Sequence, residues 1–139
     1  MITSRRVTGT SGHAWINNVD PDPGVTLASN KGSYISSMFD IAHDNGLRTG
    51  LWAGKSKFVL FKNSYDAVNG ANDLDGINNG RDKIDYENIY EDGLISDLTT
   101  DFINKMTSNP FNLSFIHYAD PDREGHTSGW STDPNSAYA

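Results

Sequence analysis

Apolar residues recur at intervals of three and four positions in two segments of the chain, which is the spacing of one face of a helix. We expect the first helix over residues 31–45, after which Gly46 supplies a left-handed stop. The second helix is expected over residues 92–109, with Asp92 as its cap and Pro110 as the residue that ends it.

Short apolar runs predict two buried strands, over residues 47–53 and 115–119. Each run follows one of the two expected helices. Strands that are joined through a helix form a crossover unit, which brings them together in a parallel sheet. The predicted fold class is therefore α/β, with a mostly parallel sheet flanked by helices.

Polar and turn-forming residues dominate the rest of the chain. The first thirty residues are expected to be loop, and residues 55–91 are expected to form a long polar surface loop. With 139 residues the chain is long enough for one compact core and too short for two ordinary domains. We therefore expect a single domain over residues 1–139.

Composition narrows the classes of function. The chain has 18 acidic and 11 basic residues and a formal net charge of -7, which argues against a nucleic-acid-binding surface and suits cations. It has no cysteine, so a metal site must use Asp, Glu and His. No apolar run approaches the roughly 18 residues of a membrane span. The amino end lacks the apolar stretch of a signal peptide.

The segment after the second expected strand holds the residues best suited to chemistry, because ligands of open α/β sheets bind at the carboxyl ends of strands. Asp122 and His126 are four residues apart and can reach one cation if the loop folds back at Gly125. Glu124 or Asp120 could add a third oxygen ligand. The alternative is a plain turn in which His126 is a solvated side chain.

Three segments resemble the alkaline phosphatase superfamily, and most closely its nucleotide pyrophosphatase and phosphodiesterase branch. Residues 117–130, HYADPDREGHTSGW, are similar to its Pro-Asp-x-x-Gly-His segment. Residues 7–18, VTGTSGHAWINN, resemble its Thr-Gly, His-Gly and Asn segment, and residues 39–58 resemble its helix, Gly-x-x-Thr strand and Gly-Lys turn. The segments occur in the family's order, and the resemblance implies a partial alkaline-phosphatase-like fold.

The resemblance also implies a function and its residues. It implies a metal-dependent phosphoester hydrolase, of phosphodiesterase, nucleotide pyrophosphatase or phosphatase type, that acts on a small phosphoester substrate. Asp122 and His126 would be ligands of one of two zinc ions. Asn18, with Asn17 as the near alternative, would contact a phosphoryl oxygen, although either could be a turn residue. Members of the family are often exported, which implies a secreted or periplasmic location.

The chain departs from the family at the nucleophile. The family's nucleophilic Thr or Ser lies shortly before its Thr-Gly pair, a place that falls at or before Met1 here. Thr3 and Ser4 lie outside the expected context, so no catalytic residue is assigned. We expect an internal or truncated segment of such a hydrolase that is inactive or very weak alone. The alternative is a non-catalytic module that binds a divalent metal or a phosphoryl ligand, or an inactive relic.

Other polar residues have structural explanations. His117 is expected to pack in its strand and make a hydrogen bond, and His43 to lie at a helix end, where imidazolium favours the dipole. Lys55 or Lys57 could face substrate phosphate, although solvated lysines are commoner. Residues 73–79 resemble a calcium loop that lacks its third oxygen ligand. Because the expected sheet has exposed edges, we expect the chain to be a marginally stable monomer or to associate with other copies.

Overall fold

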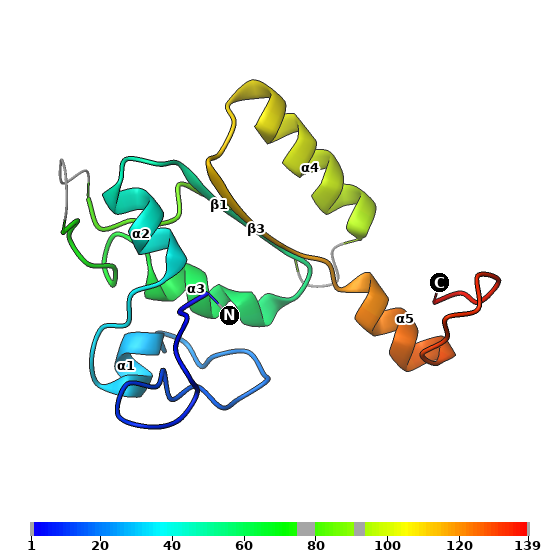
Figure 1. Ribbon diagram of the computed structural model, residues 1–139, viewed down its shortest axis with the longest axis horizontal. Coiled ribbons are helices and arrows are strands. Elements are labelled where there is room, and N and C mark those ends of the chain that lie inside the picture. Colours follow the sequence, from blue (N-terminus) through cyan, green and yellow to red (C-terminus); the bar gives the residue numbers. More distant parts are fainter. Residues whose placement is uncertain (1, 75–79, 91–93, 139) are drawn as a thin grey trace.

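The computed structural model describes residues 2–74, 80–90 and 94–138 of the chain. Three parallel strands form its sheet, in the order β2-β1-β3, and helices lie on both faces (Figure 1). This arrangement confirms the predicted α/β class. In chain order the elements are α1 (Leu27–Lys31), α2 (Met38–Asp44), β1 (Thr49–Ala53), the 3-10 helix η1 (Ser56–Phe58), α3 (Val59–Ser64), β2 (Tyr86–Ile89), α4 (Ile95–Ser108), β3 (Leu113–His117) and α5 (Asp120–Ser128).

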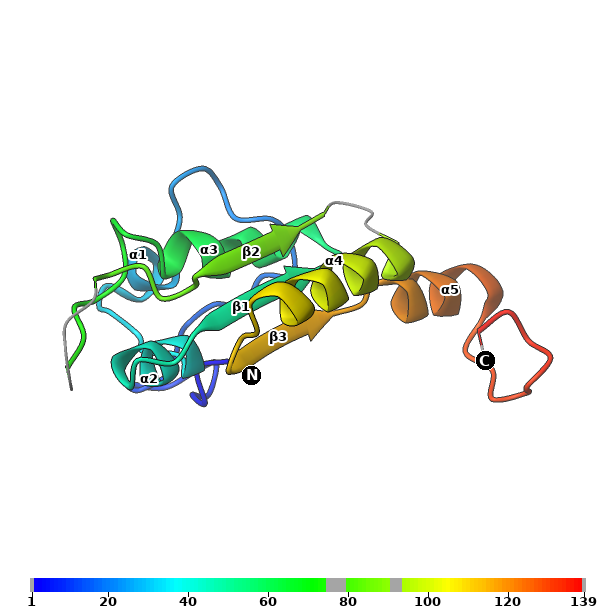
Figure 2. The same cartoon turned by 90° about the horizontal axis from the view of Figure 1, so that it is seen from above.

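β1 is the central strand and carries the core on both of its faces. All five of its residues are buried, whereas β2 and β3 are half-buried. Leu51 packs with Phe39 of α2 on one face, and Trp52 packs with Leu98 of α4 and with Phe111 on the other. Figure 1 shows α3 and α4 on opposite sides of the sheet, and Figure 2 shows the three strands side by side and pointing the same way.

α2 confirms a helix in the first amphipathic segment, but its predicted start at residue 31 is wrong. Residue 31 ends α1, which Gly32 terminates with a φ of 81°. Ser37 then starts α2 with a capping box, because its hydroxyl accepts from amides of the first turn and the Asp40 carboxylate accepts from the Ser37 amide. The loop predicted for the first thirty residues is wrong at α1, which Thr26 caps.

The long surface loop predicted over residues 55–91 is also wrong in part, because η1, α3 and β2 lie within it. The sequence pattern did not predict β2, because its polar side chains have partners only in the folded chain. Glu87 forms an ion pair with Lys62 of α3, and Asn88 donates to Asp101 of α4 at 2.8 Å. A strand can carry such residues once their polar groups are satisfied.

The other predicted elements agree better with the structure. β1 and β3 confirm both strands, and α4 confirms the second helix. Leu94 stands at the N-cap of α4, and the predicted cap Asp92 lies outside the described residues. The loop expected around Asp122 is instead helix α5, with Pro121 in its first turn, where a missing amide hydrogen costs no helical bond. Within the described residues, no helix has the length and apolarity needed to cross a membrane.

Candidate functional site

A cavity of about 390 Å³ lies at the carboxyl edge of the sheet, beyond the end of β1. The turn after β1 is tied to the end of β3, because the Gly54 amide donates to the His117 carbonyl at 2.9 Å. Arg123 of α5 donates to the Gly54 carbonyl at 3.0 Å. Ligands of parallel sheets bind at this edge, which makes the cavity the first candidate site. Its lining residues are Asn18, Val19, Asp20, Gly54, Lys55, Ser56, Lys57 and Arg123.

The cavity is cationic although the chain as a whole carries a formal charge of -7. Lys55, Lys57 and Arg123 line it together with a single carboxylate, that of Asp20. The Lys57 ammonium donates to the neutral amide oxygen of Asn18 at 2.6 Å. Among the described residues no carboxylate lies within ion-pair distance of Lys57. A net positive cavity in an acidic protein attracts anions.

The two asparagines of the amino-terminal segment lie at this cavity and beside it. Asn18 lines the cavity and accepts from Lys57. Asn17 lines an adjoining hollow of about 150 Å³, which also contains Asn18 and Lys57. The remaining walls of the hollow are mostly apolar, and its other lining residues are Trp15, Val19, Phe58 and Phe61. The structure therefore places a small aromatic hollow next to the cationic cavity.

Asp122 and His126 lie one turn apart on α5, with the imidazole Nε2 3.7 Å from a carboxylate oxygen. Two ligands of a tetrahedral zinc ion are roughly 3.4 Å apart, so the pair can share one divalent cation. The helix brings them together, and the predicted fold-back at Gly125 is wrong. Asp122 also forms an ion pair with Lys55, whose hydrogen bond to the carboxylate lowers the pKa of Asp122. Lys55 thus connects the pair to the cavity.

Among the residues with described positions, no third metal ligand lies with the pair. Glu124 accepts a hydrogen bond from Ser128, and Asp120 has a buried carboxylate oxygen that lacks a partner in the described part of the chain. Neither forms a group of three potential metal ligands with Asp122 and His126. A catalytic zinc site usually has three protein ligands. The residues therefore fit two positions of such a site and leave the others to water or substrate.

The one group of three potential metal ligands within the described residues is His43, Asp44 and Asp73. Lys83, which is fully buried, already places its ammonium there, in ion pairs with Asp73 and, at 3.3 Å, with Asp44. Its ammonium also donates to the Gly80 carbonyl at 3.1 Å. The group is therefore a buried ion network that holds the segment before β2 against α2.

His43 belongs to that network. Its Nδ1 lies 2.9 Å from the Asp73 carboxylate, and its side chain is buried. The predicted position at a helix end is confirmed, because His43 lies in the last turn of α2. Asp73 is also the first residue of the segment that resembles a calcium loop, and residues 75–79 of that segment lie outside the described residues. The side chain of Asp73 is 1% exposed and faces the Lys83 ammonium.

His117 packs at the end of β3, and its ring lies on the ring of Phe58 with centroids 4.4 Å apart. Burial lowers the pKa of His117, and the nearby charges of Lys55 and Lys57 lower it further. Its buried Nδ1 has no hydrogen-bond partner in the part of the chain that the structure describes, so the predicted side-chain hydrogen bond is not seen at that atom. The ring is held by packing and stays neutral near pH 7.

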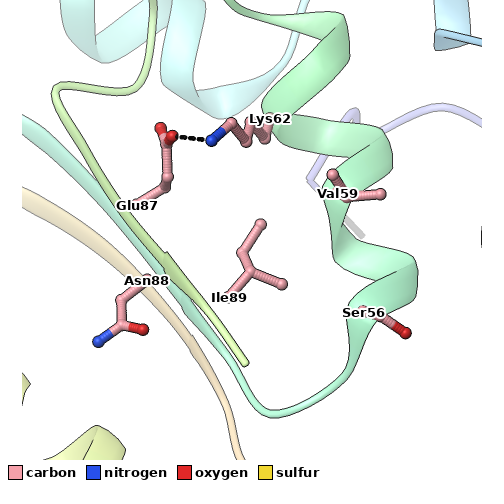
Figure 3. A pocket seen from close by; sticks show the side chains of 6 residues that line it. All are labelled: Ser56, Val59, Lys62, Glu87, Asn88 and Ile89. Atoms are coloured by element: carbon pink, nitrogen blue, oxygen red, sulfur yellow. Dashed lines mark ion pairs between the residues drawn. The ribbon is translucent and has the colours of Figure 1, made fainter. Parts of the chain in front are cut away.

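A second cavity, of about 520 Å³, lies between α3 and β2. In Figure 3 Val59 and Ile89 lie on opposite walls, and Lys62 and Glu87 form an ion pair at one end. Asn88 points away from it, toward the face that carries α4. Its two charges neutralise each other, so this cavity offers no uncompensated charge to a ligand. Its lining residues are Ser56, Val59, Lys62, Glu87, Asn88 and Ile89.

Two residues of the cationic cavity carry no sequence signal of their own. Arg123 follows Asp122 directly, but only the helix and the turn after β1 show that it reaches the Gly54 carbonyl. Ser56 stands between two lysines in a segment that reads as loop. The Gly-Lys turn was the signal that pointed to this region, and it identified Lys55 and Lys57 alone.

Comparisons with models of protein families, with curated proteins and with solved structures found no match to this chain. The resemblance to the alkaline phosphatase superfamily therefore stays a hypothesis based on three sequence segments. A partial alkaline-phosphatase-like fold likewise stays a prediction.

Proposed function

We propose that the chain binds the phosphoryl group of a small phosphoester in the cationic cavity, as part of a metal-dependent phosphoester hydrolase. The observation that supports this most is the combination of three cationic side chains around one cavity, Lys55, Lys57 and Arg123, beside the Asp122 and His126 pair. Charged hydrogen bonds from lysine and arginine are the commonest protein contacts of phosphoryl oxygens. Asp122 and His126 would bind a metal cation beside the same cavity.

The cavity suits a phosphoryl group in charge and in hydrogen bonding. Among the residues that the structure describes, the Lys57 ammonium contacts only the neutral amide oxygen of Asn18, so its charge is available to an anion. Arg123 donates to the Gly54 carbonyl, which orients its guanidinium toward the turn after β1. Cations that are oriented by protein contacts at the edge of a sheet favour the binding of an anion.

The adjoining aromatic hollow supports an ester over inorganic phosphate as the ligand. Trp15, Phe58 and Phe61 line it, and Lys57 belongs to both the hollow and the cavity. A phosphoryl group near Lys57 would therefore place its ester substituent against aromatic rings, where burial of an apolar group is favourable.

Asp122 and His126 would hold a divalent metal, which we propose is zinc because of the family resemblance. Such an ion lowers the pKa of a hydroxyl or water and neutralises charge on the phosphoryl group. Their spacing of 3.7 Å fits this role, and the 73% exposure of the His126 side chain leaves room for further ligands. A metal-binding or phosphoryl-binding module without turnover is the second candidate, because the pair supplies only two ligands.

The proposal is tested by calorimetric titration of the purified chain with phosphate and with p-nitrophenyl phosphate. Lys57→Gln should weaken binding by about tenfold, since it removes a charged hydrogen bond. Lys31→Gln is the matched control, because Lys31 is also half-buried, lies outside the cavity and donates to the Gly9 carbonyl. Equal affinity in the two variants would refute the phosphoryl site.

Hydrolysis of bis-(p-nitrophenyl) phosphate with added zinc separates the enzyme from the binding module. The enzyme hypothesis predicts zinc-dependent product release that His126→Ala abolishes. Zinc binding and phosphate binding without any release of nitrophenol would favour the non-catalytic module. Zinc affinity that His126→Ala leaves unchanged would exclude the proposed metal pair.

A further inference from the structure

The hydroxyl of Ser56 lies in the cationic cavity in contact with a carboxylate. Ser56 is the first residue of η1, directly beyond the end of β1. Its Oγ donates to a carboxylate oxygen of Asp20 at 2.8 Å, and both residues line the cavity. Figure 3 shows its hydroxyl pointing away from the side chains of the cavity beside β2. Ser56 is the one serine or threonine among the lining residues.

This environment contains what a serine needs to act as a nucleophile. A hydroxyl alone is a poor nucleophile and requires a base within hydrogen-bond reach, which Asp20 provides. The attacked group must also be held and its charge balanced. Lys55 and Lys57 flank Ser56 in the chain, and Arg123 lines the same cavity. A phosphoryl group bound by these cations would therefore lie next to the Ser56 hydroxyl.

The hydroxyls at the amino end of the chain do not compete for this role. Thr3 is buried, and its oxygen accepts from the Arg5 amide at 3.3 Å. Ser4 is exposed and has a positive φ of 52°. Neither lines the cationic cavity. The hydroxyls of Thr3 and Ser4 are thus not part of the cavity whose cations would hold the substrate.

We infer that Ser56 accepts the phosphoryl group and that Asp20 takes its proton. This inference rests on the proposed phosphoryl site. Ser56 Oγ forms a bond to phosphorus while the bond from phosphorus to the ester oxygen breaks. The proton moves from Oγ to Asp20 and then to the ester oxygen, which leaves as an alcohol. Water then attacks phosphorus, releases phosphate and restores the serine hydroxyl.

The test is acid quenching of the chain with p-nitrophenyl phosphate and zinc, followed by peptide mass spectrometry. We expect one added phosphoryl group on the peptide that contains Ser56, and none in Ser56→Ala. Asp20→Asn should slow labelling by about a hundredfold, the size expected for loss of a general base. Ser36→Ala is the control, because Ser36 is exposed and lies outside the cavity, and it should label like the wild type.

Phosphate titration of the same variants separates this inference from the proposed function. The wild type should bind phosphate through the three cations whether or not Ser56 becomes labelled. Phosphate binding without a label on Ser56, or turnover unchanged in Ser56→Ala, would overturn the role of Ser56 and leave the binding site intact. Absence of phosphate binding in the wild type would instead refute the proposed function.

Discussion

At the scale of single residues, Lys55 has two competing partners. Its ammonium forms an ion pair with Asp122, and it also lines the cationic cavity. A phosphoryl group in the cavity would compete with the Asp122 carboxylate for the same charge. A divalent cation bound by Asp122 and His126 would relieve that competition, since the carboxylate would then have another partner. Metal and phosphoryl ligand are therefore expected to bind cooperatively.

The first prediction concerns Asp122→Asn in the presence of a chelator. Removal of the carboxylate frees Lys55, so phosphate affinity should rise by about threefold, the size of a partly exposed ion pair. Calorimetric titration with phosphate measures it. Asp97→Asn removes an exposed carboxylate of α4 and serves as the control. Weaker phosphate binding in Asp122→Asn would show that Asp122 and phosphate do not compete for Lys55.

The second prediction concerns Asp101, whose carboxylate accepts from Trp52 at 2.8 Å, Tyr86 at 2.9 Å and Asn88 at 2.8 Å. Burial would raise the pKa of Asp101, but these hydrogen bonds and the charge of Lys105 outweigh it and lower the pKa. Asp101→Asn should reduce the free energy of unfolding at pH 7 by about 1–3 kcal/mol, the range for hydrogen bonds to a charged group.

The sign of the pH dependence follows from the lowered pKa. The carboxylate contributes its stability above its unfolded pKa of about 3.9, and this contribution is lost as the pH falls through the lower pKa of the folded state. The stability difference between the wild type and Asp101→Asn should therefore narrow in acid. Urea unfolding at pH 7 and in steps below pH 4 measures it. A difference that is independent of pH would contradict the prediction.

At the scale of elements, α5 brings both halves of the site together. One turn of helix places Asp122 and His126 on the same face. The next residue after Asp122, Arg123, points elsewhere and reaches the Gly54 carbonyl in the turn after β1. The helix thus carries the proposed metal ligands Asp122 and His126 and the proposed phosphoryl contact Arg123 within five residues, at the edge where β1 and β3 end.

The third prediction concerns Gly50 in β1. A Cβ at this position would lie 2.4 Å from the Trp52 ring and 3.3 Å from the Phe111 ring, inside the cluster that packs against α4. Gly50→Ala should therefore reduce the free energy of unfolding by about 1–3 kcal/mol through overpacking.

The double variant with Trp52→Phe tests the cause. If the clash with the Trp52 ring is responsible, the smaller ring should relieve it, and the two changes should cost less together than the sum of their separate costs. Urea unfolding of the four chains measures this coupling. Strictly additive costs would assign the loss to the conformational freedom of glycine and not to packing.

At the scale of the whole molecule, the sheet has an open edge along β2. Tyr90 donates its amide to the Ala53 carbonyl of β1 at 2.9 Å. Because backbone groups alternate in direction along a strand, the amides of Glu87 and Ile89 point away from β1. Among the described residues neither amide has a hydrogen-bond partner. An unpaired edge of this kind favours association.

The fourth prediction is that the chain associates as its concentration rises and that Ile89→Pro shifts the association to about tenfold higher concentration, by removing one outward amide. Light scattering after size exclusion measures it. Asn88→Pro is the control, because that amide points toward β1 and its loss should unfold the sheet edge. A wild type that stays monomeric at all concentrations would contradict the prediction.

Local patterns identified much of the fold. The spacing of apolar residues predicted α4 and part of α2, and the short apolar runs predicted β1 and β3, because periodicity is a property of neighbouring residues. α5 was missed because Asp, Pro, Gly and Ser favour turns when read in isolation. β2 was missed because its polar side chains are satisfied by Lys62 and Asp101, whose positions depend on the folded chain.

The sequence by itself determined the α/β class and placed Asp122 and His126 four residues apart, the spacing that their helix turns into a pair on one face. Only the tertiary structure decided which charged side chains line one cavity. Lys55 and Arg123 meet because β1 and β3 are parallel and end at one edge of the sheet, and the amino-terminal loop brings Asn18 to the same edge. A local pattern cannot predict that residues of distant segments lie together, because their distance depends on the path of the whole chain between them.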